Sequence, residues 1–222
     1  MIMKKSLLLF GVFMFSSCSI LFPNLFQRKS ANFSFKNLWF NTQLDYNKSS
    51  SYLFNTTQLN YNATYSDAYN KQLLDFFSKK LGGNIFIKEN YKTTDDKIII
   101  PFAIEYDLTK ENIELLQQTT DLDYIILSKK LSHDLINNPN YPQYDSLKYR
   151  SGVLAGSVVF LKIFDIRNNK VLIEMRCKSY VYNDENFNLD TNSYEKDTGI
   201  LTYKSDELLV KKGFKRILRR IE

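Results

Sequence analysis

Residues 153–182 read VLAGSVVFLKIFDIRNNKVLIEMRCKSYVY, and this stretch decides the fold. Two long runs rich in β-branched and aromatic residues, 153–166 and 171–182, flank the polar residues 167–170. Such runs are typical of strands, and paired asparagines tolerate the positive φ that a tight hairpin turn needs. The sequence therefore predicts one long β-hairpin.

The second strand of this hairpin alternates between apolar and charged residues. Its apolar positions are Val171, Ile173, Met175 and Cys177. The charged positions between them, Glu174, Arg176 and Lys178, point the other way, because successive side chains leave a strand on opposite faces. We predict that one face joins the core, that the other is wet, and that Cys177 is a buried, inert thiol.

Three helices are predicted around the hairpin. Apolar residues recur at helical spacing over 66–81 until glycines follow at Gly82, and Thr109 caps a second helix over 109–118. A third helix, 205–221, has acidic residues in its first turn. Each of the three carries one apolar stripe, so each packs against another layer.

Shorter extended segments complete the set at 33–40, 84–88, 98–100 and 122–128, whereas 133–152 and 183–202 are expected to be irregular. These elements predict an α/β (α+β) fold. It is a two-layer sandwich: a mixed sheet that carries the hairpin, with about three helices mainly on one face.

The amino terminus resembles a bacterial lipoprotein signal. Two lysines precede the apolar run 7–15, and Ser16-Ser17 stand directly before Cys18. The resemblance implies that Cys18 carries acyl chains, which anchor the protein to a membrane without spanning it. The alternative is an uncleaved membrane helix, because apolar residues continue to Phe26.

Cleavage before Cys18 defines the domains: a signal at 1–18, a tether at 19–32 and a single α/β domain at 33–222. In lipoproteins, Ser19 in place of an aspartate implies the outer membrane, and no acidic cluster follows Cys18. We therefore expect the periplasmic face of the outer membrane rather than the cell surface.

Charge and motifs limit the function classes. Loss of the two signal lysines lowers the formal net charge from +6 to +4, which is mild, so no nucleic-acid partner is expected. The sequence has no phosphate-binding glycine loop, no paired-cysteine metal site and no HExxH helix. We expect no metal, no cofactor and no enzymatic activity.

Two alternative functions would use other residues. An envelope hydrolase would use Ser132-His133-Asp134 or a pair of carboxylates, although sequence neighbours rarely form a triad and loop polarity explains the pairs. The carboxylate pairs are Asp95 with Asp96 and Asp121 with Asp123. The many tyrosines and asparagines suit a surface adhesin or glycan-binding lipoprotein. Ser146 lies in Asp145-Ser146-Leu147, which resembles an O-glycosylation motif of exported Bacteroidota proteins.

The last helix carries the strongest charge feature. Its apolar face contains Val210, Phe214, Ile217, Leu218 and Ile221. Six cations lie mostly away from that face: Lys211, Lys212, Lys215, Arg216, Arg219 and Arg220. They form either a solvated, well-capped helix surface or a site for anionic headgroups or an acidic partner. Gly213 weakens the helix and permits close approach of another backbone.

The order of elements is similar to that of a known periplasmic domain. Leu108-Thr109-Lys110-Glu111 opens a helix, Asp123-Tyr124-Ile125-Ile126-Leu127 forms the next strand, and a long hairpin and a closing helix follow. This order resembles the amino-terminal domain of TolB-type proteins and lipoproteins of the curli-secretion and penicillin-binding-protein-activator kind. The resemblance implies a non-catalytic binding and assembly role with another envelope protein, and it assigns no functional residue.

Overall fold

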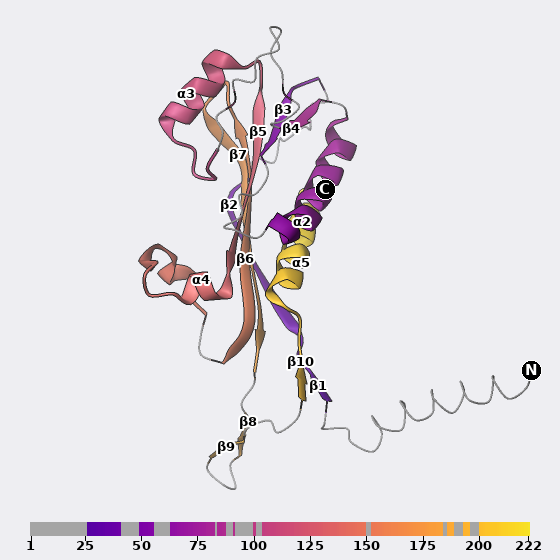
Figure 1. Ribbon diagram of the computed structural model, residues 1–222, viewed down its shortest axis with the longest axis vertical. Coiled ribbons are helices and arrows are strands. Elements are labelled where there is room, and N and C mark those ends of the chain that lie inside the picture. Colours follow the sequence, from indigo (N-terminus) through magenta and orange to yellow (C-terminus); the bar gives the residue numbers. More distant parts are fainter. Residues whose placement is uncertain are drawn as a thin grey trace, which may run out of the picture.

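The computed structural model describes residues 26–40, 49–55, 63–82, 84–87, 91, 100, 104–149, 152–183, 186–188, 193–195 and 200–222. The predicted hairpin is its longest feature: β6 (Val153–Asp165) pairs antiparallel with β7 (Lys170–Tyr182). Asn169 takes a φ of 49° in the turn, as the paired asparagines predict. Figure 1 shows the two strands running most of the length of the molecule.

A six-stranded mixed sheet grows from this hairpin in the order β2-β7-β6-β5-β3-β4. The added strands are β2 (Ala31–Phe40), β5 (Tyr124–Ser132), β3 (Tyr52–Asn55) and β4 (Ile85–Ile87). The pairs from β2 to β5 are antiparallel, and β5, β3 and β4 are parallel to one another. The order leaves β2 at one edge of the sheet.

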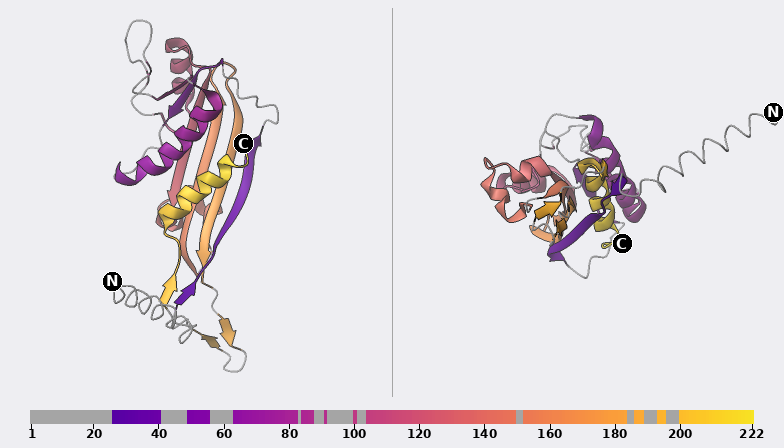
Figure 2. Two further views of the ribbon diagram at one scale, coloured as in Figure 1. Left: turned by 90° about the vertical axis from the view of Figure 1, so that its right-hand side faces the viewer. Right: turned by 90° about the horizontal axis from the view of Figure 1, so that it is seen from below.

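Two predicted helices, α2 (Ala63–Leu81) and α5 (Asp206–Leu218), cover one face of the sheet (Figure 1). Phe77, Phe214 and Ile126 are fully buried between them and the strands. The α/β sandwich with a mixed sheet is thereby confirmed. Figure 2 shows α5 crossing the strands obliquely.

The opposite face carries the third predicted helix, α3 (Lys110–Thr119). Its Leu116 packs with Leu53 and Ile125, whereas the neighbouring Ile126 faces α2, so the alternation along β5 separates two cores. Burial of apolar residues on both faces explains why helices lie on both sides.

The segment 133–152, expected to be an irregular loop, contains α4 (His133–Asn137) and the 3₁₀ helix η2 (Pro142–Leu147). That expectation is wrong, because Ile136 and Leu147 are buried against Val158. The two short helices cover the part of the hairpin that α3 leaves open (Figure 1).

The two faces of β7 depart from strict alternation. Ile173, Met175 and Cys177 face α5 as predicted, but Val171 contacts the α3 core because the register with β6 shifts between Ile163 and Phe164. The face predicted to be wet is half-buried. The Lys178 ammonium, for example, donates to the carbonyls of Leu147 and Lys148 at 2.6 and 2.9 Å.

Short strands also occur where none were expected. β1 (Phe26–Arg28) pairs parallel with β10 (Ile200–Thr202), and β8 (Asn186–Asn188) pairs with β9 (Ser193–Glu195). β1 and the start of β2 therefore fall in the segment predicted to be a tether. Within the expected strand 98–100, only Ile100 is described, and it is buried. No helix in the described ranges is long and apolar enough to span a membrane.

Phe214 tests the apolar face of α5. Its side chain is fully buried and stacks on Tyr69 with ring centroids 5.6 Å apart. We expect Phe214→Ala to lower the free energy of unfolding by about 3–5 kcal/mol, measured by urea denaturation. Leu208→Ala on the same helix, where the side chain is 40% exposed, should change it by less than about 0.5 kcal/mol. Equal losses in both variants would contradict this packing.

Candidate functional site

The candidate site is built on α5, whose position is fixed at its first turn. The Ser205 hydroxyl accepts a hydrogen bond from the Leu208 amide at 3.4 Å and caps the helix. One residue later, the Asp206 carboxylate accepts from the backbone amide of Gly156 in β6 at 2.9 Å. These contacts join the start of the helix to the hairpin.

A close contact in the middle of α5 brings the helix down onto the sheet. A Cβ atom on Gly213 would lie 2.8 Å from a methyl carbon of Val159 and 3.8 Å from the sulfur of Cys177. The sequence predicted close approach of another backbone at Gly213, but the nearest atoms belong to strand side chains. Any larger residue here would lift α5 from β6.

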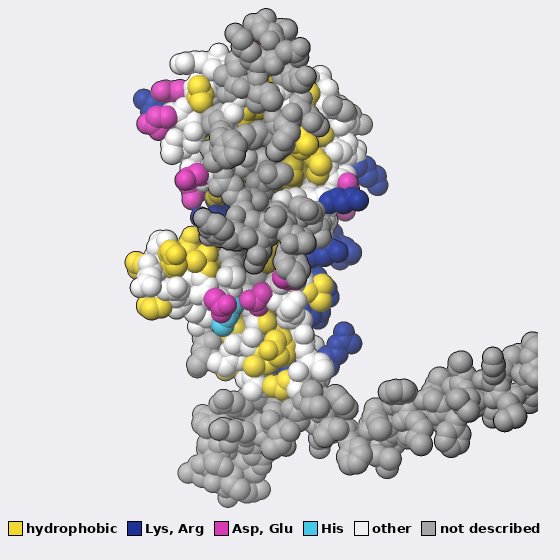
Figure 3. Space-filling view, viewed as in Figure 1, with side chains coloured by type: hydrophobic (Ala, Val, Ile, Leu, Met, Phe, Trp, Pro, Cys, Tyr) yellow, Lys and Arg dark blue, Asp and Glu magenta, His cyan; other side chains and the backbone are white. Residues whose placement is uncertain are grey.

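The outer surface of α5 and the turn that follows it carry the six cations predicted from the sequence, which we call the basic ridge: Lys211, Lys212, Lys215, Arg216, Arg219 and Arg220. Five are exposed, and Lys212 is half-buried. In Figure 3, lysine and arginine side chains gather along the side of the molecule where α2 and α5 lie. Within the described residues, no carboxylate forms a salt bridge with any member of the ridge.

Two members of the basic ridge are held against the edge strand. The Arg216 guanidinium carbon lies 3.9 Å from the ring centroid of Phe33, and that of Arg220 lies 3.9 Å from the centroid of Phe35. A guanidinium over an aromatic face is attracted by the ring quadrupole, by about 0.5–1 kcal/mol at exposed sites. The stacks orient two arginines and leave their donor groups without a described acidic partner.

The cations also act on one another and on a buried neighbour. The pKa of Lys212 is lowered first by desolvation and then by the positive charges around it. These belong to Lys204, Arg28, Arg216 and Lys215. Beneath the ridge, burial raises the pKa of the Cys177 thiol to about 12, although Arg216 and Arg220 act in the opposite direction. Cys177 is a buried free cysteine, as predicted.

The Ser132-His133-Asp134 trio is not arranged as a nucleophile, base and orienting acid. The Ser132 hydroxyl accepts from the Leu135 amide at 3.3 Å and caps α4. His133 Nε2 lies 2.8 Å from the side-chain nitrogen of Asn137, and its Nδ1 lies 3.6 Å from an oxygen of the exposed Asp134. The contacts of these three side chains are therefore local to α4.

The aspartate pairs have structural partners where they are described. Asp123 accepts from the amide and the hydroxyl of Ser51 at 2.9 and 3.1 Å, and Arg167 lies 4.0 Å from both Asp121 and Asp123. Asp95 and Asp96 lie outside the described residues, as does Cys18. No group of metal-ligating side chains occurs among the residues described. Ser146 is exposed on η2.

Sequence reasoning missed a polar cluster on the other face of the sheet. Lys162 of β6 lies 4.3 Å from the centroid of Tyr106 and 3.4 Å from Glu174, which accepts from the Tyr106 hydroxyl at 2.9 Å. Burial, then the charge of Glu174, raises the pKa of Tyr106. The feature of the sequence that could have indicated this cluster is Lys162, a lysine within an otherwise apolar strand.

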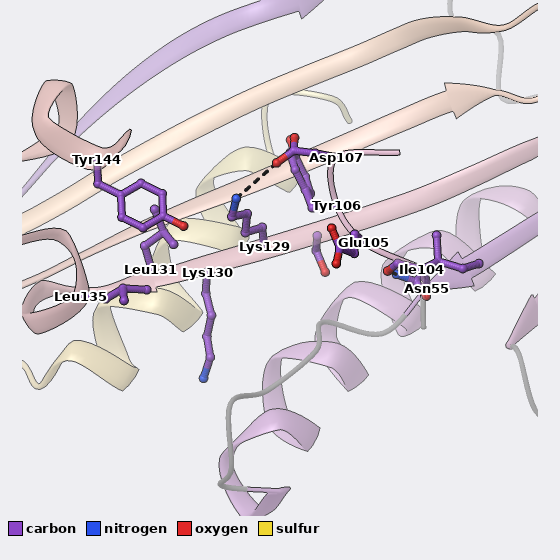
Figure 4. Close-up of a pocket in the computed structure, with 11 residues that line it drawn as sticks. Asn55, Ile104, Glu105, Tyr106, Asp107, Lys129, Lys130, Leu131, Leu135 and Tyr144 are labelled. Carbon is purple, nitrogen blue, oxygen red and sulfur yellow. Dashed lines mark hydrogen bonds and ion pairs between the residues drawn. The ribbon is translucent and has the colours of Figure 1, made fainter. Parts of the chain in front are cut away.

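Beside this cluster lies a pocket of about 240 Å³ along β5. Figure 4 shows Lys129 near Tyr144 and joined to Asp107, whose carboxylate lies 3.4 Å from the ammonium. Lys129 and Lys162 are each paired with a carboxylate here, Lys129 with Asp107 and Lys162 with Glu174. Because the basic ridge has no carboxylate partner among the described residues, it is the stronger candidate for binding.

Comparisons with known proteins add no family. No protein-family model matches the chain, and no curated protein matches it. One solved structure, the PelC dodecamer from Paraburkholderia phytofirmans, is 7% identical with a TM-score of 0.40, covering 85% of this chain and 95% of that one. A single-substitution variant of the same dodecamer is 10% identical with a TM-score of 0.31, covering 75% and 91%.

The basic ridge is expected to be dispensable for folding. Lys215 and Arg219 are exposed and have no described salt bridge, so Lys215→Glu with Arg219→Glu should change the free energy of unfolding by less than about 0.5 kcal/mol. Urea denaturation measures this, with Phe214→Ala as the destabilised reference. Unfolding of the charge variant would show that the ridge supports the fold rather than a partner.

Proposed function

We propose that this protein is an outer-membrane lipoprotein, anchored through acylated Cys18 on the periplasmic side, that binds another envelope protein without catalysing a reaction. The observation that carries the binding role is the basic ridge of α5. Six cations stand on α5 and the turn after it without a described carboxylate partner, and two of them are held in place by aromatic rings. A fixed cationic surface attracts an acidic surface and raises the rate of association.

Other features of the molecule support a binding rather than a catalytic role. The side chains named for a hydrolase lie apart: Ser132 caps α4 and His133 begins it, whereas Asp121 and Asp123 precede β5 near Ser51 and Arg167. Their hydrogen bonds cap a helix and fix a turn. The partner we propose is therefore a protein with an acidic face, and neither a cofactor nor a metal takes part.

A site-specific cross-linker tests the binding surface in intact membranes. A photoreactive residue at Lys215, on the basic ridge, should yield a discrete adduct with an envelope protein whose contact region is acidic. The matched control is Gln143, which is exposed on η2 of the opposite face. The Lys215 adduct should weaken when Lys211 and Arg219 are changed to Glu, because like charges then meet the partner. The same adducts from both positions would contradict a binding role for α5.

The anchor is tested by Cys18→Ala. Without the thiol no acyl chain can be attached, and acyl chains hold the protein because each buried CH₂ contributes about 0.8 kcal/mol. The variant should lack the acyl mass and should either stay as uncleaved precursor or leave the outer-membrane fraction. Mass spectrometry and membrane fractionation measure the two effects. A variant that fractionates like the original protein, with unchanged mass, would refute the anchor.

A further inference from the structure

The edge strand β2 offers backbone groups that no described strand uses. β2 is the last strand of the sheet and pairs only with β7 among the described elements. It is ten residues long, and its last five residues are exposed. An edge of this kind accepts an added strand, because its outward amides and carbonyls have no partner strand.

The basic ridge lies along this same edge. Phe33 and Phe35 are two residues apart on the face of β2 that looks toward α5. The stacked Arg216 and Arg220 are four residues apart, and backbone hydrogen bonds from the Arg219 and Ile221 amides to Lys215 and Ile217 continue the helical spacing past the end of α5. Two residues along a strand advance about 6.6 Å, and four residues along a helix advance about 6 Å. The arginines therefore repeat at nearly the spacing of alternate side chains on a strand. Figure 2 shows β2 at the edge of the sheet with α5 beside it.

We infer that β2 binds an extended acidic segment of another protein by strand addition, with carboxylates at alternate positions of that segment received by Arg216 and Arg220. This inference deepens the proposed function by naming how the partner binds. A guanidinium receives a carboxylate through two parallel N–H···O bonds, so oriented arginines select regularly spaced carboxylates. The exposed Trp39 and Phe40 at the end of β2 add apolar surface for the same segment.

The charges of the basic ridge argue against a second copy of this chain as the strand that pairs with β2. In an antiparallel pair of β2 strands, both basic ridges would lie on the same side of the joined sheet. Their cations would repel one another, and Lys36 adds a further exposed charge on the other face of β2. An acidic segment removes this repulsion, whereas a second copy doubles it.

The experiment uses the purified full-length protein in detergent and peptides about as long as β2. The first peptide alternates Thr and Glu, the second has the same composition in two blocks, and the third is the alternating peptide with N-methylated backbone on one edge. Fluorescence anisotropy of a labelled peptide measures affinity, and Trp39, the single tryptophan, reports contact with the strand. The alternating peptide should bind about tenfold more tightly than the other two, because only it fits both the arginines and the edge.

Protein variants separate the edge from general charge attraction. Arg216→Gln with Arg220→Gln should weaken the alternating peptide about tenfold, because the bidentate contacts are lost. Lys211→Gln with Lys215→Gln removes the same charge from the exposed side of α5 and should weaken it by less than about threefold, because exposed charges in water interact weakly.

Other outcomes overturn the inference in different ways. If all acidic peptides bind equally and both variants lower their affinity equally, the ridge attracts acidic peptides without strand addition. The inference then fails and the proposed function remains. If no peptide binds and Arg216→Gln with Arg220→Gln makes the protein self-associate, the arginines only protect the edge. If, in addition, cross-linking from Lys215 yields no specific adduct, the proposed function fails as well.

Discussion

The packing of α5 on the β6–β7 hairpin is the constraint on which the rest of the structure depends. Gly213 lets the helix approach Val159 closely, and Phe214 fills the space between the helix, Tyr69 and the sheet. Asp206 adds a hydrogen bond to the backbone of Gly156. Because one side of α5 is held in this way, its cations must face outward or toward the edge strand.

This geometry turns an ordinary cationic helix into an ordered surface. A cation on a free helix samples many rotamers, and fixing such a side chain costs up to about 2 kcal/mol of conformational entropy. Phe33 and Phe35 hold the two guanidinium groups of Arg216 and Arg220 before any partner arrives. A partner then meets donors that are already oriented, so less of the interaction energy is spent on ordering them.

The two faces of the sheet use charge differently. On the α3 side, Lys162, Tyr106 and Glu174 satisfy one another within contact distance. Burial forces this pairing, because an unpaired buried charge is costly. On the α5 side five of the six ridge cations are exposed, and none of them has a carboxylate partner among the described residues. The basic ridge, which has no carboxylate partner within the described part of the chain, is thus the surface that can serve binding without a cost to folding.

Local patterns in the sequence determined the hairpin, its asparagine turn, the three main helices and the buried position of Cys177, because periodicity and capping act over a few residues. They also located the cations of the basic ridge, but the contact of Gly213 with the side chain of Val159, rather than with another backbone, came only from the structure. Only the tertiary structure decided which face each helix covers and that α4 and η2 bury Ile136 and Leu147. The contacts of Arg216 and Arg220 with β2 join residues far apart in the chain. No sequence spacing encodes such a contact, because it exists only after β2 has paired with β7 and α5 has packed on the sheet.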